Sequence, residues 1–165
     1  MKILKIYLVV GILCFAVIQS GNTEFVITSA IQSKVEKIVY KWIEFWNTYD
    51  LDQLEELFLN DNRLTYFSSE KEGAIIGFDA IRDHHKGFGF IPGGKEQPNK
   101  LWVEDLHFAD FGTSVVVTGV WYFQKPDVPK QRGPVTIVYI GQGDRFKIAH
   151  MNFSEYKDEQ KEKED

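Results

Sequence analysis

The chain has 165 residues, of which 44% are hydrophobic and 15% aromatic, enough for one domain with a sizeable core. Its net charge of -5 argues against a nucleic-acid-binding protein, because a phosphate-binding face needs clustered lysines and arginines. The only cysteine is Cys14, so the chain beyond it has no disulfide, cysteine-ligated metal or cysteine nucleophile.

Residues 1–20 have the pattern of a secretory signal peptide. Two lysines lie in the first five residues, an apolar run covers 6–18, and the small residues Ser20 and Gly21 offer a cleavage site. This pattern predicts a secreted or periplasmic protein with no stable membrane insertion after cleavage. Two alternatives stay open: the segment is kept as an anchor, or Cys14 carries a lipid.

The next segment is dominated by helical spacing. Apolar residues recur at intervals of three and four from 31 to 49, which predicts a long helix with a wide aromatic face. Thr28 or Ser29 is expected to cap its start. Asp50 is expected to cap a second helix, which ends in the polar turn at 60–62.

The middle of the chain, residues 63–100, is predicted to form several short elements. Residues 63–69 predict a strand, and 74–77 a short return strand after a charged turn. Residues 78–86 predict a third helix, ended by Gly87. The irregular segment 87–100 contains apolar side chains, so it is expected to act as a lid over an apolar surface.

The last third predicts a sheet. Strands are expected to begin at Leu101, Ser114, Pro134 and Phe146, with tight turns between most of them. Helices followed by a mostly antiparallel sheet are typical of an α+β domain, here predicted for 21–155. A long helix against a curled sheet is expected to leave a conical cavity. The almost wholly polar tail, 156–165, is expected to be solvated and disordered.

Four segments together carry a likeness to a known family; they are 46–58, 77–82, 115–123 and 146–154. In order and spacing they resemble the NTF2-like superfamily, and within it the SnoaL-like and DUF4440-type domains. The resemblance implies a cone-shaped α+β barrel in which three N-terminal helices pack on a curved, mostly antiparallel sheet. It also implies a homodimer formed through the back of the sheet. It implies no single activity, because the superfamily includes isomerases, dehydratases, cyclases and proteins without chemistry.

The aromatic residues exceed what a small core needs, so some are expected to line a ligand cavity closed by the loop from Phe88 to Ile91. The candidate ligand-binding residues are Trp42, Trp46, Tyr66, Ile81, His85, Phe88, Phe90, Trp121, Met151 and Phe153.

Three residues are candidates for acid–base catalysis: His85 or Asp105 as the base, and Tyr66 as the donor to a developing oxyanion. Asp105 is expected to share a strand face with His107, which makes a carboxylate–imidazole pair, or else both lie on an outer, wet face. No acidic residue matches the position that enzymes of the superfamily use.

The other histidines have simpler interpretations. His84 and His85 are adjacent on a helix, so their rings diverge by about 100° and do not converge on a metal. His150 and Asn152 share a strand face, and if Met151 and Phe153 point inward, His150 is structural.

These observations give three functional hypotheses. The first is an exported domain that binds a small apolar or amphipathic molecule in the cone, without demonstrable catalysis and with no cofactor or metal. The second is a cofactor-independent isomerase, dehydratase or cyclase that uses an acid–base residue in the same cavity. The third is a dimeric interaction module.

Overall fold

The computed structural model describes residues 21–156, with side chains from residue 30 onward. The predicted signal segment 1–20 and residues 157–165 of the predicted tail lie outside the described residues. No helix within 21–156 is both long enough and apolar enough to cross a membrane.

The first helix, α1, spans Gly21–Thr48. It begins earlier than the predicted start at Thr28 or Ser29, because the residues before them contain no proline that would stop a helix. From residue 35 onward its buried side chains recur at intervals of three and four, as the periodicity predicts. They are Val35, Val39, Trp42, Phe45 and Trp46.

The predicted second helix is shorter than expected. A 3-10 turn, η1 (Leu51–Gln53), leads into one turn of helix, α2 (Leu54–Leu57). Asp50 caps the turn as predicted: its carboxylate accepts hydrogen bonds from the Asp52 backbone N–H at 3.1 Å and the Gln53 side-chain amide at 3.2 Å. The helix ends at Phe58 because that residue takes an extended conformation and bridges to β6.

The third helix, α3 (Phe78–Gly87), follows two short strands and ends at the glycine, as predicted. The strands are β1 (Thr65–Phe67), β2 (Ile75–Ile76), β3 (Lys100–Asp110), β4 (Ser114–Gln124), β5 (Gln131–Gln142) and β6 (Arg145–Phe153).

These six strands form one sheet in the order β2-β1-β6-β5-β4-β3. Neighbouring strands are antiparallel except for β1 and β6, which are parallel. The sheet is curved but does not close into a barrel, so β2 and β3 are its edges. The predicted α+β architecture is confirmed.

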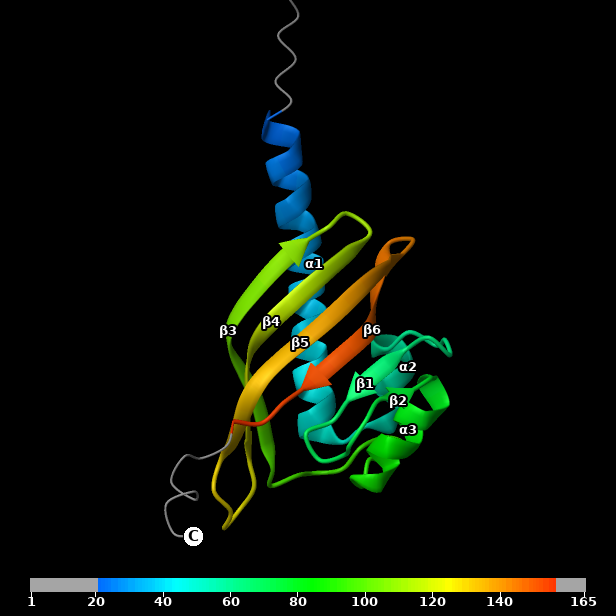
Figure 1. The fold of residues 1–165 in the computed structure, drawn as a ribbon, viewed down its shortest axis with the longest axis vertical. Coiled ribbons are helices and arrows are strands. Elements are labelled where there is room, and N and C mark those ends of the chain that lie inside the picture. The colour runs from blue at the N-terminus through cyan, green and yellow to red at the C-terminus, as the bar shows by residue number, and fades with distance from the viewer. Residues whose placement is uncertain (1–20, 157–165) are drawn as a thin grey trace, which may run out of the picture.

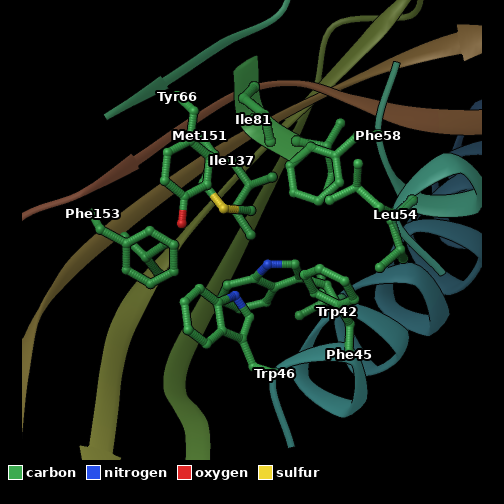
Figure 2. Packing of buried hydrophobic residues seen from close by; sticks show 14 of the residues in the cluster. Trp42, Phe45, Trp46, Leu54, Phe58, Tyr66, Ile81, Ile137, Met151 and Phe153 are labelled. Atoms are coloured by element: carbon green, nitrogen blue, oxygen red, sulfur yellow. The ribbon is translucent and has the colours of Figure 1, made fainter. Parts of the chain in front are cut away.

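The long strands β3 to β6 cross α1, and α2 and α3 lie beside its C-terminal half (Figure 1). The core fills the space between α1 and the inner face of the sheet (Figure 2). Alternation along β4 turns Val115, Val117, Trp121 and Phe123 toward this core. The fold therefore brings the aromatic face of α1 against an equally aromatic sheet face.

Candidate functional site

A cavity of about 280 Å³ lies at the end of the sheet where β4 ends and β5 begins. Its wall is mainly aromatic and is formed by residues from α1, β1, β3, β4, β6 and the loop after α3. The apolar lining residues are Trp46, Tyr66, Phe88, Leu101, Trp121, Phe123 and Phe153.

Phe153, at the end of β6, lies at the centre of this wall. Its ring centroid is 5.6 Å from that of Trp121, 6.0 Å from Tyr66 and 6.4 Å from Trp46. Close-up, Trp46 and Tyr66 flank Phe153 from opposite sides (Figure 2). Rings at these separations pack edge to face or tilted, which leaves flat faces turned toward the hollow.

Hydrogen bonds hold the wall in place from behind. The Asn47 side chain bonds both backbone groups of Leu101: its amide donates to the carbonyl at 3.0 Å, and its oxygen accepts from the N–H at 2.7 Å. The Trp121 indole N–H donates to the Ser154 carbonyl at 2.8 Å. A Cβ at Gly133 would lie 1.8 Å from that carbonyl oxygen, so only glycine allows this approach.

One side of the cavity is polar. Tyr49 and Asn99 meet there, with the Asn99 amide donating to the Tyr49 hydroxyl at 3.1 Å. The remaining polar lining residues are Ser68, Ser69, Glu70, Lys125 and Gln131. The site therefore combines an aromatic wall with a rim of amide, hydroxyl, carboxylate and amine groups.

The two phenols of the lining stay protonated near neutral pH. Burial raises the pKa of Tyr66, and the nearby Glu70 carboxylate raises it further. Burial also raises the pKa of Tyr49, against the opposing hydrogen bond from Asn99. Figure 2 shows the Tyr66 hydroxyl directed to the side on which Phe153 and Trp46 lie. Tyr66 is thus a neutral hydrogen-bond donor at the cavity wall.

His85 is enclosed in the core and does not line the cavity. It is completely buried, and its ring lies 5.1 Å from Phe45 and 5.2 Å from Phe90, measured between ring centroids. Burial lowers its pKa to about 3, so the imidazole is neutral near neutral pH. Nδ1 lies 2.8 Å from the Ile81 carbonyl and donates to it, and among the described residues Nε2 has no hydrogen-bond partner.

The predicted ligand-binding residues divide into two groups. Five line the cavity: Trp46, Tyr66, Phe88, Trp121 and Phe153. The other five are buried in the adjoining core and do not line the cavity: Trp42, Ile81, His85, Phe90 and Met151.

Asp105 and His107 are exposed on β3 and lie outside the cavity lining. The pairing of β3 with β4 shifts register between Glu104 and His107, and Asp105 has a positive φ of 53° there. This bulge interrupts the alternation from which a shared strand face was inferred for Asp105 and His107. The structure therefore does not bring Asp105 together with Tyr66 or His85.

The remaining histidines do not line the cavity, but His84 lies behind its wall, with its ring centroid 4.8 Å from that of Phe88 and 5.5 Å from that of Tyr66. The His84 and His85 rings are nearly perpendicular, at 83°. His150 points away from the buried Met151, and its Nδ1 lies 2.7 Å from the Thr65 hydroxyl oxygen. Within the described part of the chain, no three potential metal-ligating side chains cluster together.

Several lining residues were missed by the sequence analysis. Phe123 lies two positions after Trp121 and so shares its strand face, which alternation alone indicates. Leu101 opposes Phe123 across the ladder and follows from the same argument once the register is known. Asn99 and Lys125 lie in loops, where no periodicity marks the direction of a side chain.

No family model matches the sequence, and no curated protein matches it. Solved structures do match the fold. An NTF2-like superfamily protein from Salmonella enterica serovar Typhimurium is 14% identical, with a TM-score of 0.68 over 80% of this chain and 95% of that one. An NTF2-like protein of unknown function from Pseudomonas putida KT2440 is 17% identical, with a TM-score of 0.69 over 82% of this chain and 93% of that one.

The association domain of Caenorhabditis elegans CaMKII is similar too, at 15% identity and a TM-score of 0.63, over 76% of this chain and 96% of that one. The structure thus has the NTF2-like fold that the four segments indicated. At these identities the likeness concerns the fold alone.

Proposed function

We propose that this chain binds a small, mainly apolar molecule with one polar end in the cavity beside Phe153. The observation that carries the proposal is the mainly aromatic hollow of about 280 Å³, whose lining also includes a small set of polar side chains. Concave, mainly apolar hollows with a few placed polar groups are the usual binding sites for small molecules.

The lining favours a molecule with a flat or ring-shaped apolar part. Trp46, Trp121 and Phe153 present rings that contact such a part by stacking or edge-to-face packing. The Tyr66 hydroxyl offers a hydrogen bond to an acceptor within the apolar part. Lys125 and Gln131 on the rim favour a polar or anionic end that remains near solvent.

The acid–base alternative has less support. Catalysis of that kind requires a titratable base within hydrogen-bonding reach of the substrate. Of the three candidates, only Tyr66 lines the cavity, and its phenol is held neutral by burial. His85 is enclosed by aromatic rings, and Asp105 is exposed on β3. Among the described residues, Glu70 is the one carboxylate of the lining, and it is exposed at the rim. Binding without proton transfer is therefore the function that we propose.

The test uses N-phenyl-1-naphthylamine, a neutral fluorescent probe. Because Trp46 and Trp121 line the cavity, we expect saturable quenching of tryptophan fluorescence as the probe binds. Ser68 lines the cavity and is half-buried. Ser68→Phe adds a ring that occupies part of the space that the probe needs. We therefore expect it to weaken binding by about tenfold, which corresponds to the loss of roughly one favourable contact.

Ser114→Phe is the matched control, since Ser114 is half-buried at the opposite end of the sheet. It is expected to leave the affinity unchanged. Equal affinity in the wild type and in Ser68→Phe, or no saturable binding at all, would overturn the proposal.

A second proposal concerns self-association through the outer face of the sheet. Outward-facing residues of β4 and β5 are apolar and half-exposed, among them Val116, Val120, Val138 and Ile140. Contiguous apolar area of this kind is typical of an association surface. The similar structure from C. elegans is an association domain. Light scattering should give a dimer for the wild type and a monomer for Val138→Glu, whereas a monomeric wild type would refute the proposal.

We also propose that the chain is exported through residues 1–20. The support is the charged start, the short apolar run and the small residues after it. Mass spectrometry of the protein recovered from its own cells should find an N-terminus close to residue 21. Intact residues 1–20 in the recovered protein would contradict this proposal.

A further inference from the structure

A second hollow, of about 480 Å³, lies between α1 and the start of β6. The start of β6 and the end of β4, beside which the aromatic cavity lies, are at opposite ends of the sheet (Figure 1). The walls of the second hollow carry five cationic side chains. Lys34, Lys37 and Lys41 follow one face of α1, and Arg145 and Lys147 belong to β6. Such a concentration is unexpected in a chain with a net charge of -5.

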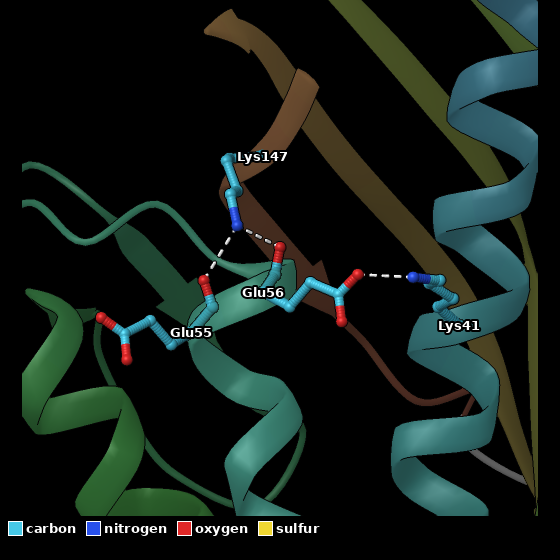
Figure 3. A network of polar contacts seen from close by, with 4 residues as sticks. All are labelled: Lys41, Glu55, Glu56 and Lys147. Atoms are coloured by element: carbon cyan, nitrogen blue, oxygen red, sulfur yellow. Dashed lines mark hydrogen bonds and ion pairs between the residues drawn. The ribbon is translucent and has the colours of Figure 1, made fainter. Parts of the chain in front are cut away.

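Two of these cations are occupied by contacts that build the groove. The Lys41 amine pairs with the Glu56 carboxylate, which joins α1 to α2. The Lys147 amine donates to the backbone carbonyls of Glu55 and Glu56, which joins β6 to the same short helix (Figure 3). The groove is therefore held in shape from three elements before any ligand arrives.

The other three cations, Lys34, Lys37 and Arg145, form no ion pair within the described part of the chain. The five cations of the lining outnumber its two carboxylates, Glu56 and Asp144. Burial lowers the pKa of Lys147; the Glu56 and Glu55 carboxylates oppose this shift, and the positive charges of Arg145 and Lys41 add to it. The groove thus keeps an excess of positive charge that an anion would neutralise.

Apolar side chains complete the lining. Ile38 lies between the lysines on α1, Phe146 lies between the cations of β6, and Leu57 is almost fully buried between them. An inorganic anion would satisfy the charges and leave this surface uncovered. An apolar molecule would cover the surface and leave the charges unpaired. The groove therefore matches a ligand that combines both features.

We propose that this groove binds a soluble, single-chain organic anion. Its carboxylate or phosphate head lies among Lys34, Lys37 and Arg145, and its chain lies on Ile38 and Phe146. The hollow is bounded by a helix and a strand end, so it encloses one head group, whereas a membrane surface needs a broad cationic face. Nucleic acid needs a longer positive track than these three free cations provide.

The test is isothermal titration calorimetry with octyl phosphate at concentrations at which it is monomeric. We expect saturable binding of one molecule per chain, weakened by added salt. Two control compounds each supply half of the ligand: inorganic phosphate lacks the apolar chain, and 1-octanol lacks the anionic head. Each is expected to bind at least about tenfold more weakly than octyl phosphate, because it makes only one of the two kinds of contact.

A double variant, Lys37→Gln with Arg145→Gln, is expected to weaken binding of octyl phosphate by at least about tenfold, because charge-assisted contacts are lost. The matched control is Lys71→Gln with Arg132→Gln, which removes the same charges from exposed positions outside the groove. It is expected to leave the affinity unchanged. Ser68→Phe is also expected to bind octyl phosphate normally, which separates this site from the aromatic cavity.

Three results would overturn the proposal: equal losses in the two double variants, octanol binding as tightly as octyl phosphate, or loss of binding in Ser68→Phe. Vesicles of phosphatidylcholine with and without phosphatidylglycerol test the remaining source of such a head group. Capture by the anionic vesicles without binding of monomeric octyl phosphate would also refute a site for a soluble ligand.

Discussion

Two parts of one aromatic cluster differ in how completely they are covered. Around His85, the rings of Phe45, Phe58 and Phe90 pack closely, and the imidazole fills the space between them. Around Phe153, rings of equal size leave the cavity beside β4. Both parts face the same stretch of α1, so the difference does not come from the helix.

The difference comes from the elements that close each part. Helix α3 places Ile81 and His85 directly over the first part, and both are completely buried. The second part is bordered by the loop after α3, of which only the half-buried Phe88 and Asn99 line the cavity. A helix supplies side chains at every turn, whereas a loop supplies them sparsely, and a hollow remains where the loop takes over.

The largest expected effect comes from truncating one ring in each part. Phe45→Ala removes a completely buried ring of the part around His85 and should lower the free energy of unfolding by about 3–5 kcal/mol. Phe88→Ala removes a half-buried ring that already borders empty space, and should lower it by only about 1 kcal/mol. Urea unfolding followed by circular dichroism measures both.

The comparison between the two parts fails if the two truncations are equally destabilising. That result would mean that Phe88 is packed as tightly as Phe45 and that the cavity is filled in solution. The m-value should remain the same in both variants, which confirms that the unfolded state is unchanged.

The closely packed part around His85 illustrates why the fold was easier to predict than the site. Helical spacing predicted which side chains of α1 face inward, and the structure confirms this prediction. The strand β4 begins at Ser114, as predicted. The order of helices and strands then indicated the NTF2-like fold. Periodicity cannot report how α3 is seated, so Ile81 and His85 were assigned to the cavity, whereas they fill the packed part beside it.

The other differences between the predictions and the structure have local causes. The bulge in β3 breaks the period-two argument at Asp105. The lining residues Asn99 and Lys125 lie in loops, where neither period applies. The groove near Arg145 joins residues distant in the sequence, so its charge appears only when α1 and β6 lie side by side.

The closed part should also make stability depend on pH through His85. The pKa falls from the ordinary 6.5 to about 3 on folding, so the unfolded chain binds more protons between those values. The contribution of the neutral His85 to the free energy of unfolding is complete above the pKa that His85 has in the unfolded chain. It is lost as the pH falls toward the pKa of His85 in the folded protein. Between about pH 7 and pH 5 it should decrease by about 2 kcal/mol.

Urea unfolding at a series of pH values measures this slope. His85→Leu should flatten the curve, because the leucine binds no proton in either state. His107→Leu, at an exposed position on β3, is the matched control and should keep the wild-type slope. A slope that survives in His85→Leu would assign the pH dependence to other groups and would contradict a sealed, neutral imidazole.

The smallest expected effect compares a hydroxyl enclosed elsewhere in the core with one that borders the cavity. The Tyr139 hydroxyl is buried and has no hydrogen-bond partner among the described residues, so Tyr139→Phe should raise the free energy of unfolding by about 0.5–1 kcal/mol. The Tyr66 hydroxyl borders the cavity, where water satisfies it, so Tyr66→Phe should change stability by less than about 0.5 kcal/mol.

Thermal and urea unfolding of the two variants, measured side by side, test this pair. The same deletion then gives a gain where the hydroxyl is enclosed and no change where it reaches the hollow. A clear loss of stability in Tyr66→Phe would mean that its hydroxyl is bonded within the protein. In that case Tyr66 would be part of the packed core, and the donor that the binding site requires would have to come from Tyr49 or the rim.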